Sequence, residues 1–241
     1  MIVCEHLSKQ FEKDIGIKDV NLSFSQGLIY GIIGYNGAGK TTLLRCIEGL
    51  YLPSSGSVWH DKIGTRQEKQ FVNIRRSISF LPTDDYLYNK LSCLENIELA
   101  TILKTGKKNL LKETKLLIEY FEADKYLSKR FMDCSSGMKK KIQIIISLIG
   151  DINTIIWDEP NDGLDVITNI RLKELLSYYK RKNVTILLSS HVIEFLEGFI
   201  DYCILLKDGE IITAKEKKDI NSIKELYIEH LEKDVIALPF K

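Results

Sequence analysis

The chain has 241 residues, of which 44% are hydrophobic and 28% are charged, as in a globular protein with one large or two small domains. Its 34 Lys and Arg residues nearly balance its 33 Asp and Glu residues, and the net charge of +1 argues against a nucleic-acid partner. The five cysteines are scattered without C-x-x-C spacing, which argues against a disulfide framework and a zinc site and favours reduced thiols.

The first predicted elements are two strands followed by a turn and a helix. Apolar and polar residues alternate over residues 20–24, as in a half-exposed strand. Residues 28–33, LIYGII, are apolar throughout, which is typical of a strand covered on both faces. After a glycine-rich turn, apolar residues at helical spacing predict a helix up to Pro53, namely Leu43, Leu44, Ile47 and Leu50.

The turn itself, GYNGAGKTT at residues 34–42, satisfies the pattern G-x-x-x-x-G-K-[ST] between a buried strand and a helix. Glycines let the backbone fold tightly, so that N–H groups at a helix N-terminus face the phosphates of a nucleotide. Lys40 supplies a cation for the β- and γ-phosphates, and the Thr41 hydroxyl is a candidate Mg²⁺ ligand. The alternative is a turn that merely connects two elements. The predicted phosphate-binding residues are Gly34, Tyr35, Asn36, Gly37, Ala38, Gly39, Lys40, Thr41 and Thr42.

Later in the chain, helical patterns separate this first unit from further strands. Residues 91–104, 110–124 and 137–150 have helical patterns with few strand signals among them. Apolar strands are predicted at 154–157 and 184–188, and a hairpin at 202–213 around the turn at 207–209. We therefore expect an α/β fold in which about 60 residues of helix interrupt the core, followed by a short polar, helical tail from about Lys215.

Two carboxylates, Asp158 and Glu159, follow directly after the apolar strand at 154–157. Ligands of open parallel sheets bind beyond the carboxyl ends of the strands, so both side chains should face the phosphates. Asp158 would hold Mg²⁺, directly or through water, and Glu159 would orient or deprotonate the attacking water. His191 ends the next strand and would reach the γ-phosphate or hold the water with Glu159. The alternatives are an acidic helix cap and a structural histidine.

In this order, the motifs and the intervening CSSGM, residues 134–138, resemble the ATP-binding cassette (ABC) ATPase family over residues 1–213. The family's signature usually reads LSGGQ before the strand that carries Asp and Glu. Here it departs at the first, third and fifth positions. The resemblance implies that Ser135, Ser136 and Gly137 contact the ATP of a second chain, with a hydroxyl and an unhindered N–H at a helix N-terminus. The lysines at 139–141 are expected to form a solvated face.

The resemblance extends to three further places. Residues 160–165, PNDGLD, resemble the family's D-loop and include Asp165. Phe11 lies where an aromatic ring would stack on adenine, with a buried core position as the alternative. Residues 80–88 resemble the loop that usually carries Gln or Glu at the metal. Thr83, a further candidate metal ligand, is shorter than Gln and would act through a water, and Asp84 is a possible substitute.

The resemblance also implies a fold and its domain organisation. We expect a single ABC ATPase domain with a P-loop (RecA-like) core, an antiparallel β subdomain and an inserted helical subdomain. The nucleotide-binding core would comprise residues 1–85 and 151–214, the helical subdomain residues 86–150, and the C-terminal tail residues 215–241.

By resemblance, the function is that of a transporter subunit that binds ATP and Mg²⁺, hydrolyses ATP and powers a separate transmembrane permease. The S-x-G-M-K form of the signature favours export over import. Residues 1–11 lack the pattern of a signal peptide, and no apolar run approaches the roughly 20 residues of a membrane span. We therefore expect a peripheral position at the cytoplasmic face of the membrane.

Three questions stay open at this point. The first is whether the second cassette is an identical copy or a paralogue. The alternative function is a soluble ABC ATPase in assembly, repair or sensing. A P-loop kinase or GTPase would leave the order of the signature, the Asp-Glu pair and the histidine as coincidence.

Overall fold

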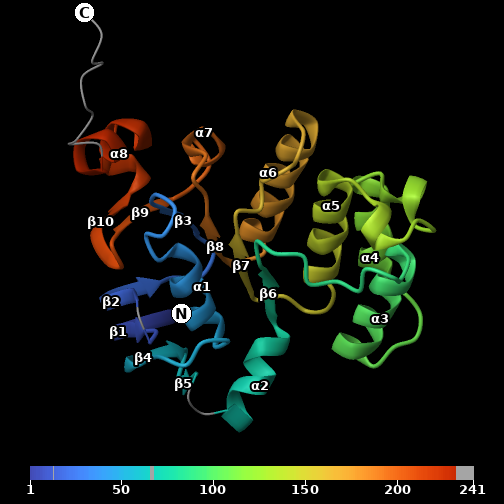
Figure 1. Ribbon diagram of the computed structural model, residues 1–241, viewed down its shortest axis with the longest axis horizontal. Coiled ribbons are helices and arrows are strands. Elements are labelled where there is room, and N and C mark those ends of the chain that lie inside the picture. Colours follow the sequence, from blue (N-terminus) through green and yellow to red (C-terminus); the bar gives the residue numbers. More distant parts are fainter. Residues whose placement is uncertain (13, 66–67, 232–241) are drawn as a thin grey trace, which may run out of the picture.

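The computed structural model describes residues 1–12, 14–65 and 68–231, and its central feature is a six-stranded sheet. The strand order is β10-β9-β3-β8-β7-β6 (Figure 1). All neighbours from β9 to β6 pair in parallel, and β10 is antiparallel to β9. The strands are β3 (Ile29–Ile33), β6 (Ile78–Leu81), β7 (Thr154–Asp158), β8 (Thr185–Ser189), β9 (Tyr202–Lys207) and β10 (Glu210–Glu216). The predicted α/β class is confirmed.

A second, antiparallel sheet with the order β2-β1-β4-β5 covers one side of the first (Figure 1). Its strands are β1 (Ile2–Gln10), β2 (Ile15–Phe24), β4 (Ser55–His60) and β5 (Ile63–Gly64). Helix α1 (Lys40–Glu48) lies between the two sheets: Leu44 shares one buried cluster with Leu7 of β1 and Leu187 of β8. Burial on both sides explains why β3 is apolar along its whole length.

Helices α3 (Cys93–Thr105), α4 (Lys112–Tyr120) and α5 (Ser136–Ser147) pack together at one end of the molecule (Figure 1). Helix α3 starts with a capping box, in which Ser92 Oγ accepts from the Glu95 N–H and Glu95 accepts from the Ser92 N–H. The predicted subdomain boundaries at residues 85 and 150 fall in the segments that join β6 to α3 and α5 to β7.

The remaining helices cover the larger sheet and its ends. They are α2 (Glu68–Arg76), α6 (Val166–Arg181), α7 (Ile193–Leu196) and α8 (Ile223–Leu231), with short 3-10 turns at Ala123–Tyr126, Phe131–Asp133 and Lys217–Asp219. In the described part of the chain, no helix is both long and apolar enough to cross a membrane. All five cysteines are buried, and the Sγ atoms of Cys93 and Cys134 lie 3.5 Å apart.

Two predicted boundaries are wrong. Helix α1 ends at Glu48 instead of near Pro53, because Gly49 adopts a left-handed φ of 81° and its N–H bonds to the Cys46 carbonyl. Leu50 is therefore 55% exposed. The tail is not helical from Lys215, since β10 continues to Glu216 and α8 begins at Ile223. The last ten residues of the predicted tail, 232–241, lie outside the described residues.

The predicted hairpin near the C-terminus is confirmed. Strands β9 and β10 pair across Asp208 and Gly209, whose φ values of 49° and 80° are both left-handed, as a tight two-residue hairpin turn requires.

Candidate active site

The carboxyl ends of β3, β7 and β8 bring the three predicted motifs to one edge of the larger sheet. The register pairs Asp158 with Ser189, and Ile32 with the same Ser189, so that β8 lies between the other two strands. The P-loop, defined as residues 34–42, leaves β3 at this edge, and His191 leaves β8 there. Motifs that are far apart in sequence therefore surround one point.

The first and last glycines of the P-loop are required by close backbone approaches. A Cβ at Gly34 would lie 2.4 Å from the Leu206 carbonyl oxygen. At Gly39, the N-cap of α1 with a φ of 105°, a Cβ would lie 2.4 Å from the Gly16 carbonyl oxygen. Lys40 is buried, and its Nζ donates to the Gly34 carbonyl at 2.7 Å. The loop thus holds the lysine over its own main chain at the start of α1.

Four oxygen-bearing side chains form a group that we call the hydroxyl–carboxylate cluster: Thr41, Thr83, Asp158 and Ser189. Thr41 Oγ1 and Thr83 Oγ1 donate to Asp158 Oδ2 at 2.6 and 2.8 Å. Ser189 Oγ donates to the other carboxylate oxygen. Asp158 is 1% exposed, and a buried carboxylate needs such donors. An all-oxygen set of hydroxyls and one carboxylate fits the ligand preference of Mg²⁺.

The loop at residues 80–88 makes a contact that the sequence did not predict. It follows β6, and the Thr83 hydroxyl donates to Asp158 Oδ2. Asp84 does not join the cluster. Its side chain is 84% exposed, and Arg45 Nη2 lies 3.6 Å from its Oδ2.

Glu159 and His191 form a direct pair next to this cluster. His191 Nδ1 lies 2.9 Å from Glu159 Oε2, and the His191 N–H donates to the same oxygen at 3.1 Å. Lys40 Nζ lies 3.6 Å from Glu159 Oε1. The Glu159 side chain is 10% exposed, whereas that of His191 is 50% exposed. The pair thus offers a buried carboxylate with an accessible imidazole beside it, the arrangement of a base with an orienting partner.

Phe11 is not a core residue, so the buried alternative is wrong. The side chain is 39% exposed and meets the Tyr51 ring edge-on, with the ring centroids 5.6 Å apart. A Cβ at Gly16 would touch both Phe11 and Thr42, at 2.8 and 2.7 Å, so the Phe11 ring lies beside the start of α1. Sequence reasoning missed Tyr51, for which the sequence offers no motif.

The predicted signature residues lie at the N-terminus of α5. Ser135 is the N-cap, and its Oγ accepts from the Met138 N–H at 3.3 Å. Ser135 and Ser136 are exposed and Gly137 is half-exposed. Among the described residues, no hydrogen bond joins these three to the P-loop of the same chain. Asp165 caps α6 in the same way, and the Thr168 N–H and hydroxyl lower the pKa of its carboxyl group.

The expectation of a solvated lysine face at residues 139–141 is wrong at Lys140. This side chain is 6% exposed, because it lies on the face of α5 that packs against the chain after β7. Lys139 donates to Asp85 at 2.7 Å. Helical spacing on α5 could have revealed this burial, since Lys140 lies four residues before Ile144, which is fully buried.

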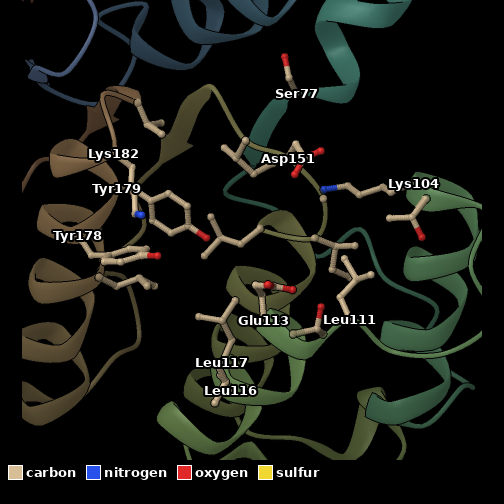
Figure 2. A pocket seen from close by; sticks show the side chains of 18 of the residues that line it. Ser77, Lys104, Leu111, Glu113, Leu116, Leu117, Asp151, Tyr178, Tyr179 and Lys182 are labelled. Atoms are coloured by element: carbon tan, nitrogen blue, oxygen red, sulfur yellow. The ribbon is translucent and has the colours of Figure 1, made fainter.

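A cavity of about 1310 Å³ lies elsewhere, between α4, α6 and the amino-terminal end of the larger sheet (Figure 2). It contains none of the predicted site residues. Its lining mixes both signs of charge. Lys104 donates to the Ile146 and Ser147 carbonyls, and burial lowers its pKa to about 8. It therefore caps the end of α5.

Comparisons with known proteins agree with this geometry. The family model described as ABC transporter matches residues 17–162. The lantibiotic transport ATP-binding protein SrtF of Streptococcus pyogenes is 30% identical over 227 residues, 94% of this chain and 96% of the relative. NatA, an ABC transporter ATP-binding protein of Bacillus subtilis, is 32% identical and covers 88% of each chain. A solved dimeric ATP-binding cassette with bound ADP and Pi is 27% identical, with a TM-score of 0.80 over 90% of this chain and 98% of that one.

Proposed function

We propose a mechanism and a set of partners for this chain, which belongs to the ABC transporter family as an ATP-binding subunit that hydrolyses ATP. The observation that carries the mechanism is the buried Glu159 carboxylate. It lies next to the hydroxyl–carboxylate cluster and is paired with His191 at 2.9 Å. A carboxylate held in this way is ready to accept a proton at the edge of the sheet where nucleotide phosphates bind.

In the proposed mechanism, the P-loop main chain and Lys40 bind the phosphates of ATP. Thr41 and Asp158, with Thr83 next to them, would hold Mg²⁺, which supplies positive charge to the β- and γ-phosphate oxygens. Glu159 orients a water molecule and takes its proton as the water oxygen attacks the γ-phosphorus. The bond from the γ-phosphorus to the bridging oxygen breaks, and ADP and phosphate leave. His191 keeps the Glu159 carboxylate in position.

The binding of adenine is assigned to Phe11. Its ring is exposed and lies beside the start of α1, so that a base attached to phosphates in the P-loop would come within stacking range. Stacking tolerates any base, so this contact alone would give little preference for ATP over GTP.

A second cassette completes each site in this proposal. Ser135, Ser136 and Gly137 are accessible at a helix N-terminus, where N–H groups and a hydroxyl favour an anion. They would contact the ATP held by the partner, and Asp165 would lie at the same interface. The solved relative with ADP and Pi is itself a dimer. An identical copy and a paralogue are both compatible with this arrangement.

The wider assignment is to a membrane transporter. We infer that the chain works at the cytoplasmic face of a membrane and drives a separate transmembrane permease. Two observations favour export as the direction. One is the S-x-G-M-K form of the signature, and the other is the similarity to SrtF, a lantibiotic transport ATP-binding protein. The competing assignment is a non-transport ABC ATPase. Co-purification from detergent-solubilised membranes separates the two, since a polytopic partner supports transport and a consistently soluble one contradicts it.

The experiment that tests the mechanism is the solution mass and ATPase rate of Glu159→Gln with and without Mg-ATP. We expect ATP binding to persist, the mass to double and kcat to fall by roughly 10²- to 10⁴-fold, because general-base catalysis is lost. Glu98→Gln, on the exposed face of α3, is the matched control. Undiminished turnover in Glu159→Gln would remove Glu159 from the base role. A monomer that binds ATP would point to a different second cassette or to a permease that holds the two together.

A further inference from the structure

Lys140 is a buried ammonium group on the signature helix of this chain. It is 6% exposed, and its Nζ lies 3.5 Å from the main-chain carbonyl oxygen of Glu159. Burial of an ammonium group is costly unless polar or charged groups face it, so the position calls for a specific role.

The main chain of Glu159 has an uncommon conformation that needs support. Its φ of 49° lies in the left-handed region, which residues with a Cβ adopt at a cost. The Glu159 N–H donates to Ser189 Oγ at 2.9 Å, while its carbonyl accepts from the Asp162 N–H at 3.3 Å and faces Lys140. Groups from outside this residue therefore hold both of the peptide units next to it.

The charges around Lys140 explain why an ammonium group is tolerated there. Burial lowers its pKa, and surrounding carboxylates oppose that change. These carboxylates are Asp162, Asp158, Asp85 and Glu159. They come from the end of β7, from the turn that follows it and from the loop before α3, which are the segments that face the first turns of α5. Lys140 is therefore a cation placed among the acidic groups of the candidate site.

The start of α5 also packs directly on the turn that follows Glu159. A Cβ at Gly137 would lie 2.9 Å from the Gly163 carbonyl oxygen, and one at Gly163 would lie 3.3 Å from Ser136 Oγ. With so little space, a shift of the signature helix must be accompanied by a shift of the 159–163 turn. Lys140 extends this contact from the turn to the catalytic residue itself.

We propose that Lys140 is a positioning residue that holds the main chain of Glu159 for water activation and joins the signature segment to the catalytic carboxylate of the same chain. This inference rests on the proposed role of Glu159. A partner's ATP bound at Ser135–Gly137 would then influence hydrolysis in the chain that carries the signature, as well as in the partner.

The test compares Lys140→Met, which keeps the aliphatic stem, with Lys140→Arg, which keeps the cation. We expect Lys140→Met to lower kcat at least tenfold while KM for ATP changes less than threefold, since small displacements of a catalytic group are costly. Lys140→Arg should recover kcat to within about threefold of wild type. In the Glu159→Gln background, Lys140→Met should still dimerise with Mg-ATP, because nucleotide binding does not need the cation. Lys141→Met, the next and half-exposed lysine, is the control and should stay within twofold.

Turnover within twofold of wild type in Lys140→Met would overturn the inference, as would equal losses in the Met and Arg variants. A merely structural role would lower the melting temperature, kcat and ATP affinity together, which would also overturn it. If Lys140→Met does not fold, Lys140→Ala takes its place in the same comparison. Glu159→Gln is measured in parallel. Full activity in Glu159→Gln would contradict the proposed role of Glu159. If Glu159→Gln is inactive and Lys140→Met is fully active, only the role of Lys140 is contradicted.

Discussion

The two regions that would meet ATP differ in how far one chain completes them. At the carboxyl edge of the larger sheet, Asp158, Glu159 and Ser189 are buried; Asp158 accepts from Thr41 and Thr83, and the Glu159 N–H donates to Ser189. At the N-terminus of α5, Ser135 and Ser136 are exposed. Among the residues that the structure describes, the Ser135 hydroxyl makes one hydrogen bond, accepting from the Met138 N–H at 3.3 Å as a helix cap.

The two regions therefore differ in what each of them needs from a partner molecule. The first region is assembled by the strand order, which places three carboxyl ends side by side. The second presents a helix N-terminus outwards, and in our proposal the ATP of another cassette binds there. The start of α5 nevertheless touches the turn after Glu159, so the incomplete region is mechanically attached to the complete one.

The contrast between the two regions would fail if the Ser135 hydroxyl did nothing beyond capping α5. We expect Ser135→Ala to weaken ATP-driven dimerisation and turnover by roughly 10- to 100-fold, since a hydrogen bond to a charged oxygen is worth about 1.5–3 kcal/mol. Ser92→Ala is the matched control, because Ser92 caps α3 with the same geometry. Both substitutions should cost about 1 kcal/mol of stability.

Thermal unfolding and ATPase rates of the two serine variants decide between these roles. Equal activity losses in Ser135→Ala and Ser92→Ala would show that the signature serine matters through helix stability alone.

A smaller effect is expected at Thr83, which lies at the carboxyl edge of the larger sheet. Thr83→Val removes one donor from Asp158 and keeps the shape of the side chain. We expect turnover to fall about tenfold and the Mg²⁺ requirement to rise, as for other residues that orient metal ligands. Thr65→Val is the control and should leave activity unchanged, because the Thr65 hydroxyl near β5 is buried and has no hydrogen-bond partner among the described residues.

The measurement that checks the role of Thr83 is a Mg²⁺ titration of the ATPase rate of Thr83→Val. An unchanged titration curve in Thr83→Val would mean that the hydroxyl merely satisfies the buried carboxylate, and that the loop at 80–88 has no part in metal binding.

The smallest effect is expected at Phe11. Phe11→Leu should raise KM for ATP and for GTP by about two- to tenfold each, because an aromatic stacking contact is worth about 0.5–1.5 kcal/mol. Phe11→Trp should keep both values near wild type. A loss confined to ATP, or a Phe11→Leu variant with unchanged KM for both nucleotides, would contradict stacking as the role of this ring.

The sequence predicted those parts of the site in which local pattern and function coincide. The P-loop is a contiguous motif, and Asp158, Glu159 and His191 stand at the ends of apolar strands, so their convergence followed from the rule for parallel sheets. The helical insertion was visible from its periodicity. The burial of Lys140 and the contact between Thr83 and Asp158 were not predicted, because chain path and packing against distant segments decide both.

By itself, the sequence determined the α/β class, the phosphate-binding loop and the acidic residues of the strand after the insertion, because each depends on contiguous residues or on the period of a buried element. Only the tertiary structure decided that Thr41, Thr83 and Ser189 share one carboxylate and that Phe11 is exposed. It also decided that Lys140 reaches the main chain of Glu159. These contacts join residues separated by 19 to 117 positions, and the packing of helices on a sheet, which no local pattern specifies, sets their distances.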